Sequence, residues 1–210
     1  MEDLFFEAKG GDMTMTMDVR EAAKEPVLRV RTAEPDDAQE VLDIYRHYVE
    51  NTAVTFECIA PTLDEMRGRI EKALERYPYL VAERDGRIVG FASAGPFKTR
   101  HAYDWSVETT VYVSAAERGA GVGAALYEAL EEALQQMGVL NLYACVACPD
   151  VEDEYLTDAS FRFHERRGFS KIGEFRHCGN KFGRWYSMTW MGKTIGSHEP
   201  DPAPIRPFAA

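Results

Sequence analysis

Apolar and polar residues follow two different periods from Pro26 to about residue 192. Apolar residues that recur every three or four positions predict helices, whereas strict alternation and short apolar runs predict strands. The predicted helices cover residues 36–49, 62–77, 122–137 and 158–167, and the predicted strands cover 27–31, 79–83, 88–94, 105–113, 139–148, 169–176 and 184–191. The order β-α-α-β-β-β-α-β-α-β-β predicts a single α/β domain with a mixed sheet of about seven strands and about four helices.

The two ends of the chain lack these periods. Residues 1–26 are interpreted as a flexible N-terminal leader. Residues 193–210 carry four prolines in the last eleven positions and are interpreted as an extended tail. The domain therefore spans 27–192. Within it, Asp85-Gly86 predicts a tight hairpin turn, and Asp36 or Asp37 is expected to cap the first helix.

The chain is acidic, with a formal net charge of −11 from 24 basic and 35 acidic residues. Residues 1–26 hold 7 acidic and 3 basic residues, and residues 150–158 hold 5 acidic residues and no basic one. The remainder is close to neutral and shows no basic stripe, which argues against a nucleic-acid partner. No apolar run is long enough to span a membrane, the acidic start is not a secretory signal, and four cysteines are too few for a disulfide framework. We therefore expect a cytoplasmic protein without a membrane partner.

Residues 118–124, Arg-Gly-Ala-Gly-Val-Gly-Ala, follow a predicted strand and open a predicted helix. Glycines at such a turn let the backbone approach a bulky anion, whose charge faces the free N–H groups of the helix start. Ala124-Ala125 stands where a Walker A loop needs Lys and Ser or Thr, so an NTPase is excluded. The spacing also matches a dinucleotide fingerprint, but residues 139–148 offer no acidic residue for a ribose hydroxyl. A redox enzyme is therefore disfavoured, and the segment resembles instead the loop with which acyl-CoA-dependent acetyltransferases bind the pyrophosphate of coenzyme A.

Several longer strings carry a resemblance to a known family. They are Glu50–Phe56, Arg76–Glu83, Ala94–Arg100, Ala102–Trp105, Val107–Val113 and Phe182–Trp185. With the glycine loop, they make residues from about 27 to 192 resemble the GNAT acetyltransferases, and among them the phosphinothricin N-acetyltransferases. The resemblance implies a GNAT acyl-CoA N-acyltransferase fold, acetyl-CoA as co-substrate and no metal. It also implies a small amino-acid substrate such as phosphinothricin or methionine sulfoximine, and a homodimer.

The resemblance further implies site residues. Its general base matches Glu108. His164 matches the catalytic position at which many GNAT enzymes have a Tyr that protonates the leaving thiolate, and at which the phosphinothricin family has His. It implies cofactor binding by Val111, Tyr112, Val113, Arg118, Gly119, Ala120, Gly121, Val122, Gly123, Ala124, Thr157 and Ser160. It implies substrate binding by Phe56, Lys98, Arg100, Tyr103, Tyr112 and Tyr127.

Spacing alone leaves the roles of these residues open. Strand alternation places Glu108 on one face with Thr110 and Tyr112, where it could take a proton from an amine or pair across the sheet. His164 could equally be a packed helix histidine, and Tyr127 a core aromatic residue rather than a pocket wall. Lys98 and Arg100 could form either an anion clamp or a solvated basic loop.

One segment departs from the family. Residues 150–157 form an acidic insertion after Pro149, and Thr157 stands where the family has an Asn that begins the next helix. Thr can still cap a helix, but its reach is shorter. We therefore expect this segment to alter the affinity for acetyl-CoA.

Two further interpretations concern the cysteines and the function class. Cys145 and Cys148 could contribute to a zinc site, but both are expected to be small buried residues of an apolar strand. The resemblance implies an N-acetyltransferase acting on a small amino acid, and Glu108 on the pocket face favours an enzyme over a protein that only binds acyl-CoA. The alternatives are a protein or peptide N-acetyltransferase, which needs an open groove, and a non-catalytic acyl-CoA sensor, which needs no base.

Overall fold

The computed structural model describes residues 27–209, so the predicted leader 1–26 lies outside the described residues. In chain order the elements are β1 (Arg29–Thr32), η1 (Pro35–Asp37), α1 (Ala38–Asn51), α2 (Leu63–Leu74), β2 (Tyr79–Arg84), β3 (Arg87–Pro96), η2 (His101–Tyr103), β4 (Ser106–Val113), η3 (Ala115–Glu117), α3 (Val122–Met137), β5 (Asn141–Cys148), α4 (Ala159–Arg166), β6 (Ser170–Lys181) and β7 (Arg184–Thr194). The predicted order of helices and strands is confirmed. None of the helices in this range is long and apolar enough to cross a membrane.

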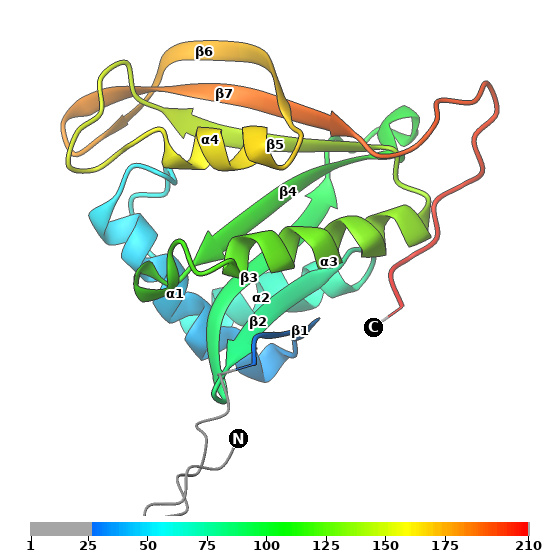
Figure 1. Cartoon of the computed structure of the whole chain (residues 1–210), viewed down its shortest axis with the longest axis horizontal. Helices are drawn as coiled ribbons and strands as arrows, with labels where there is room; N and C mark the ends of the chain where they lie inside the picture. Colours follow the sequence, from blue (N-terminus) through cyan, green and yellow to red (C-terminus); the bar gives the residue numbers. More distant parts are fainter. Residues whose placement is uncertain (1–26, 210) are drawn as a thin grey trace, which may run out of the picture.

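The strands form one mixed sheet in the order β1-β2-β3-β4-β5-β7-β6. Every neighbouring pair is antiparallel except β4 and β5, which are parallel and pair only through Ser106–Glu108 and Asn141–Tyr143. Beyond this short ladder the two strands diverge, and the sheet opens into two halves (Figure 1). Because both strands continue for several residues past the ladder, β4 borders a gap in the middle of the sheet.

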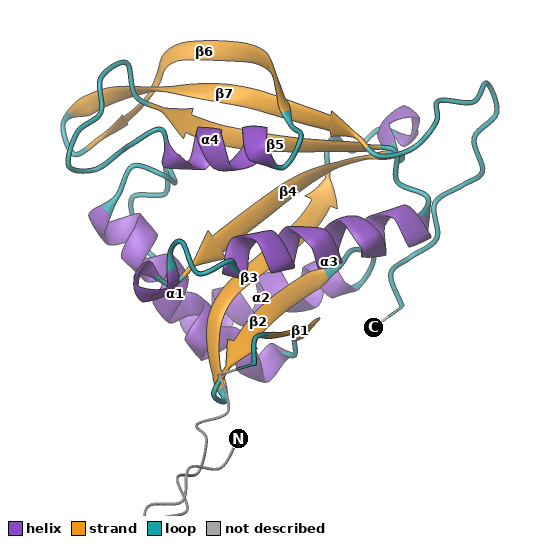
Figure 2. Ribbon diagram, viewed as in Figure 1, coloured by secondary structure: helices purple, strands orange, loops and turns teal. Residues whose placement is uncertain are grey.

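Helices cover both faces of the half formed by β1–β4 (Figure 2). On one face, α1 and α2 pack their apolar residues against side chains of β2 and β3 such as Tyr79, Val81 and Phe91. On the other face, α3 buries Leu126, Leu130 and other apolar residues against the alternate positions of the same strands. The period of 3.6 in the helices and of 2 in the strands places these residues at the interfaces. Each core therefore follows from the sequence pattern.

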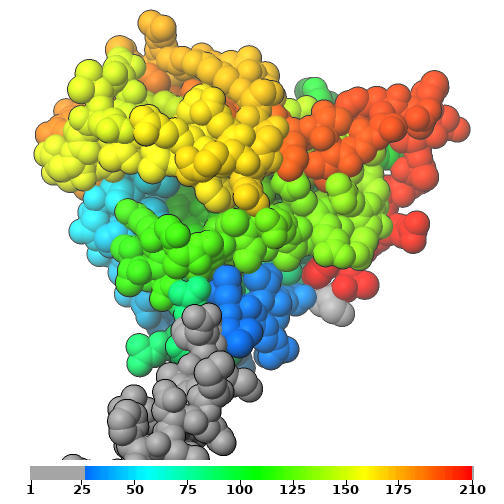
Figure 3. All heavy atoms as spheres, viewed as in Figure 1, coloured from blue at the N-terminus to red at the C-terminus, as the bar shows by residue number. Residues whose placement is uncertain are grey.

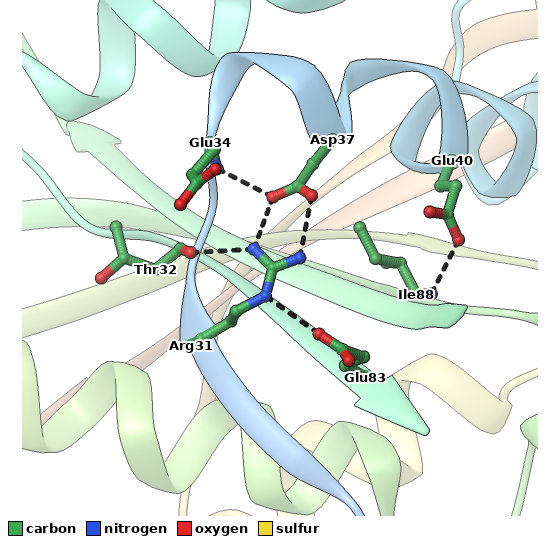
Figure 4. A network of polar contacts seen from close by, with 7 residues as sticks. All are labelled: Arg31, Thr32, Glu34, Asp37, Glu40, Glu83 and Ile88. Carbon is green, nitrogen blue, oxygen red and sulfur yellow. Dashed lines mark hydrogen bonds and ion pairs between the residues drawn. The ribbon is translucent and has the colours of Figure 1, made fainter. Parts of the chain in front are cut away.

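An ion-pair network fastens β1 to the start of α1 (Figure 4). The Arg31 guanidinium donates to both carboxylate oxygens of Asp37, at 2.7 and 2.9 Å, and to Glu83 of β2 at 3.0 Å. Asp37 also accepts from the Glu34 backbone N–H at 2.8 Å, so its carboxylate caps η1. Asp37 is the N-cap residue of α1, as predicted, although its side chain makes no hydrogen bond to the first turn of that helix.

The C-terminal segment is bound to the domain, which its prolines did not indicate. The Arg206 N–H donates to the Met137 carbonyl at 2.8 Å, and the Phe208 N–H donates to the Arg76 carbonyl at 3.0 Å. Ile205 and Phe208 pack against the core that α3 buries. In Figure 3 this segment (red) follows the edge of the molecule at the end of α3. The C-terminal segment thus packs on the domain, and the domain boundary at 192 stays a prediction.

Candidate active site

The gap between β4 and β5 leaves backbone groups of β4 without a strand partner. Val111 and Val113 pair with β3 on one side, while the β5 side of residues 109–113 carries no ladder. β5 meanwhile continues to pair with β7 as far as Cys148. Unpaired N–H and C=O groups of a strand can bond an extended ligand in the manner of an added strand. Val111, Tyr112 and Val113 are thus placed where the amides of a pantetheine arm could bind.

The glycine loop lies at the end of β4 and begins α3. Gly119 and Gly121 both have φ of +81°, a left-handed conformation that glycine adopts without strain. A Cβ added at either position would meet no heavy atom within 4 Å, so the loop is open on that side. The first turn of α3 carries no acidic side chain, and its free N–H groups can therefore attract an anion. These features fit the pyrophosphate of coenzyme A.

Arg118 and Gly123 fix this loop against its neighbours. The Arg118 guanidinium lies 5.1 Å from the ring centre of Tyr48, and the Tyr48 hydroxyl donates to the Val113 carbonyl at 2.6 Å. A Cβ at Gly123 would lie 3.3 Å from the ring of Phe163, so α3 and α4 approach closely at this point. The loop, the end of β4 and the start of α4 therefore border one region, and Figure 3 shows α4 (yellow) above the start of α3 (green).

Glu108 lies at the point where β4 and β5 begin to diverge, in the last residue pair of their ladder. Burial raises the pKa of its carboxyl, and the nearby Lys98 ammonium partly opposes this increase. Lys98 itself lies over the rings of Phe97 and Trp190, at 4.7 and 5.6 Å. A half-buried carboxylate with a raised pKa can accept a proton near neutral pH. The structure thus brings together Glu108 and Lys98, two of the predicted site residues.

His164 lies on the opposite side of the sheet and is buried, with 5% of its surface exposed. Its Nδ1 lies 2.7 Å from the Ser160 carbonyl, and its Nε2 lies 3.0 Å from the Tyr127 hydroxyl. Burial lowers its pKa, so the imidazole is neutral. In that state Nδ1–H donates to Ser160, and Nε2 accepts from the Tyr127 hydroxyl. His164 is therefore held in one tautomer.

Tyr127 continues this network to β4. Its hydroxyl lies 3.0 Å from Thr109 Oγ1, which in turn lies 3.2 Å from the Tyr143 carbonyl of β5. Tyr127 has no exposed surface, so it cannot contact a substrate in this arrangement. The prediction that it lines the substrate pocket is wrong. Because Thr109 alternates with Glu108, its side chain points to the α3 side of the sheet, where Tyr127 belongs to the core.

The remaining predicted substrate residues occupy two places. Phe56, in the segment between α1 and α2, packs on the β6 backbone so closely that a Cβ at Gly179 would clash with its ring. The adjacent Thr55 carbonyl accepts from Lys181 Nζ at 2.8 Å, which ties this segment to the β6–β7 hairpin. Arg100 and Tyr103 are exposed around η2. In the described part of the chain Arg100 makes no ion pair, so nothing in the structure tests its predicted role.

The acidic insertion 150–157 is hydrogen-bonded to the β6–β7 hairpin. Arg184 donates to Asp153 and Glu154, each at 2.8 Å, and the Tyr186 hydroxyl donates to Asp153 at 2.9 Å. Burial alone would raise the pKa of Asp153, but these hydrogen bonds hold it at about 2. Much of the negative charge is thus paired within the protein. Thr157 Oγ1 accepts weakly from the Ala159 N–H, at 3.4 Å, and whether this segment alters acetyl-CoA affinity stays a prediction.

A cavity of about 290 Å³ lies between α1, α2 and the Glu108 face of the sheet. Thr110 and Tyr112 of β4 line it, as alternation from Glu108 requires. Tyr112 is among the predicted site residues, whereas the residues of α1, α2, β2, β3 and the segment between α1 and α2 that complete the cavity were not predicted. Thr110 could have been found from its strand face, whereas no local signal distinguishes the others, which are Tyr45, Glu57, Met66, Arg69, Ala73, Tyr79, Phe91 and Ser93.

The cysteines do not follow the expected burial. Cys145 is exposed, because alternation along β5 places it on the Glu108 side, while Cys148 is partly buried against the α3 core. Although the residue as a whole is exposed, neighbouring atoms partly desolvate its thiol, and this desolvation together with the nearby Glu108 raises the pKa of Cys145 to about 11. The thiol therefore stays protonated near neutral pH. Within residues 27–209, no cluster of three or more His, Cys, Asp or Glu side chains could hold a metal ion.

The fold and the glycine loop define an acyl-CoA-binding enzyme, and the comparisons with known proteins agree. Residues 30–190 match the family described as acetyltransferase (GNAT) domain. The chain belongs to this family and is an acetyl-CoA-dependent N-acetyltransferase. The predicted fold is thereby confirmed, as is acetyl-CoA as co-substrate.

Relatives with assigned activities narrow the comparison. The chain is 36% identical over 180 residues to phosphinothricin N-acetyltransferase of Streptomyces viridochromogenes. This match covers 86% of this chain and 94% of the relative. It is also 30% identical to the L-methionine sulfoximine/L-methionine sulfone acetyltransferase of Salmonella typhimurium. This second match covers 81% of this chain and 96% of the relative. The resemblance to the phosphinothricin N-acetyltransferases is therefore confirmed at the level of sequence.

Solved structures are similar as well. A phosphinothricin acetyltransferase from Sinorhizobium meliloti in complex with AcCoA has a TM-score of 0.76 and 30% identity, and the match covers 84% of this chain and 93% of that one. A ribosomal-protein-alanine N-acetyltransferase from Brucella melitensis has a TM-score of 0.73 and 33% identity, covering 80% and 99%. The names of these two proteins give different acceptors, phosphinothricin and the alanine of a ribosomal protein.

Proposed function

We propose that this enzyme transfers the acetyl group of acetyl-CoA to the α-amine of a small amino acid of the phosphinothricin or methionine sulfoximine type. The observation that carries this proposal is the position of Glu108, half-buried at the divergence of β4 and β5 and on the side of the 290 Å³ cavity. A cavity of this volume can hold the side chain of a small amino acid.

Glu108 acts as the general base in this proposal. An α-amine has a reference pKa near 8 and is mostly protonated at neutral pH, so it must lose a proton before it can attack. When bound, acetyl-CoA supplies an acetyl thioester that an amine can attack. The raised pKa of Glu108 makes its carboxylate a better proton acceptor than an exposed one. Lys98, whose charge acts on the same carboxylate, is proposed to attract the α-carboxylate of the substrate.

In this proposal His164 has a positioning role, in place of the catalytic role that the resemblance implies. Its buried, neutral imidazole holds α4 and its Ser160 carbonyl in place beside the start of α3. Arg100 and Tyr103 are proposed to contact the substrate from the η2 loop, and Phe56 to form an apolar wall. Thr157 and Ser160 precede and begin α4, where they border the proposed acetyl-CoA site.

The experiment incubates the enzyme with acetyl-CoA and a panel of amino acids and a peptide with N-terminal alanine, and detects N-acetyl products by mass. We expect acetylated methionine sulfone, methionine sulfoximine or phosphinothricin. In Glu108→Gln, kcat should fall by about 10²–10⁴-fold, since the shape is kept and the proton acceptor is lost. Glu132→Gln, an exposed residue of α3, is the matched control. Acetylation of the peptide alone would replace the proposal with a protein N-acetyltransferase, and coenzyme A binding without any product would indicate a sensor.

The wild-type rate should also depend on pH in a defined direction. Because Glu108 must be ionised, kcat/KM should fall as the pH drops below the raised pKa of this carboxyl. A profile that is flat through the acidic range would argue against Glu108 as the base.

We also propose that the enzyme is a cytoplasmic homodimer. The edge strand β6 exposes Ile172 and Phe175, at 59% and 55%, and Trp185 of β7 is 63% exposed. Large apolar side chains exposed along one edge hairpin favour burial against a second surface. Light scattering on the purified protein measures the mass, and a monomer at micromolar concentration would contradict the homodimer.

A further inference from the structure

The cavity beside Glu108 offers a polar floor and aromatic walls. Ser93 of β3 lies opposite Thr110 of β4 in the sheet, so the two hydroxyls are neighbours on its floor. Tyr45 and Tyr112 form part of the wall, with ring centres 5.0 Å apart. The Tyr45 hydroxyl is already bonded to Thr55 at 3.0 Å. A ligand in the cavity would therefore meet apolar ring surface and neutral hydrogen-bonding groups.

The cavity is within reach of a substrate that is held at Glu108. Thr110 is two residues beyond Glu108 on the same strand face, which corresponds to about 7 Å along β4. An amino acid whose amine faces Glu108 can span this distance with a side chain of three or four atoms. The polar head of that side chain would then lie over Ser93 and Thr110.

The cavity is lined by one cation, Arg69, and this cation is paired. Arg69 of α2 bonds both carboxylate oxygens of Glu57, at 3.0 and 3.3 Å. Its guanidinium also lies 5.8 Å from the ring centre of Tyr45. Lys181 interacts electrostatically with Glu57, but it does not line the cavity. Its ammonium donates to the Thr55 carbonyl instead. An anionic head in the cavity would thus have to compete with Glu57 for Arg69.

We propose that this cavity binds the side chain of the acceptor amino acid, and that the Glu57–Arg69 pair selects neutral polar heads over anionic ones. The inference rests on the proposed function and specifies its substrate class. A sulfone or sulfoximine is neutral and can accept hydrogen bonds from the two hydroxyls. The phosphinate of phosphinothricin carries a negative charge, which Glu57 repels and which the paired Arg69 cannot fully bind. The α-carboxylate is common to both substrates and does not contribute to the selection.

The experiment measures kcat/KM for L-methionine sulfone and for phosphinothricin in the wild type, in Glu57→Gln and in Arg69→Gln. We expect the wild type to prefer the sulfone. Glu57→Gln frees Arg69 and should shift the ratio towards phosphinothricin by about five- to tenfold, the smaller end reflecting solvent screening of a half-exposed pair. Arg69→Gln leaves Glu57 unpaired and should shift the ratio in the opposite direction. Glu75→Gln, which removes an exposed ion pair with Lys72 further along α2, should leave the ratio unchanged.

The outcomes separate this inference from the proposed function. A wild type that acetylates neither amino acid overturns the proposed function and this inference with it. Acetylation of both amino acids at a ratio that is the same in all variants overturns the inference alone. An equal shift of this ratio in Glu75→Gln would also overturn the inference, because it would show a general effect of charge. If the Glu57 and Arg69 variants instead change the use of propionyl-CoA relative to acetyl-CoA, the cavity holds the acyl chain and the inference is wrong.

Discussion

The hydrogen bonds of the Tyr127 hydroxyl can be removed without changing the packing of the ring. Tyr127→Phe keeps the aromatic ring, which is fully buried, and deletes the hydroxyl that lies 3.0 Å from both His164 Nε2 and Thr109 Oγ1. Thr109 keeps a second partner, the Tyr143 carbonyl at 3.2 Å. His164 Nε2 loses its donor, because its other neighbours are the rings of Phe163 and Phe169. The variant therefore leaves one buried nitrogen without a partner.

The free-energy cost of leaving that buried nitrogen without a hydrogen-bond partner determines the expected loss of stability. A buried polar group without a partner costs about 1–3 kcal/mol. For a domain of this size, each kcal/mol corresponds to a fall in Tm of about 2–4 °C. We therefore expect Tyr127→Phe to melt about 2–12 °C below the wild type, and urea unfolding to give a free energy lower by about 1–3 kcal/mol.

A second tyrosine provides the matched control. Tyr79 is also buried, but its hydroxyl contacts only Met66 Sδ, at 4.0 Å, which is a weak acceptor. Tyr79→Phe should therefore change the free energy of unfolding by less than about 0.5 kcal/mol. The reasoning is refuted if Tyr127→Phe is as stable as the wild type, or if both variants lose the same stability.

Two further predictions concern the glycine loop and the C-terminal segment. In Gly121→Val, the left-handed φ of +81° should cost about 1–2 kcal/mol of stability, and the branched side chain should weaken acetyl-CoA binding in calorimetry by about tenfold or more. Gly68→Ala on α2 is the control, and normal binding by Gly121→Val would exclude the pyrophosphate assignment. Phe208→Ala should lower the free energy of unfolding by about 1–2 kcal/mol, since Phe208 is partly buried against the core. A variant that unfolds like the wild type would show that the segment after 194 is not held there.

The helices, the strands and their order follow from the sequence. Alternation places Glu108, Thr110 and Tyr112 on one face of β4, and the structure has them there. Asp85-Gly86 forms the tight turn between β2 and β3, with both residues at positive φ, because few other dipeptides adopt that conformation at low cost. Gly121 and Gly138 border α3 as predicted, since a glycine is favoured where a helix start or end is left-handed. These features depend on local backbone preferences and on one side-chain period, both of which can be read within a few residues.

The tertiary structure decided which groups meet. Tyr127 lies one helical turn into α3, and only the packing of α3 against α4 and β4 sets its hydroxyl between His164 and Thr109. The pairing of Glu57 with Arg69, and their place beside Ser93 and Thr110, depend on how α2 lies across the sheet. The charge of the insertion is offset by Arg184, about thirty residues further along the chain. Such contacts join segments that are distant in the sequence, and no local pattern carries their geometry.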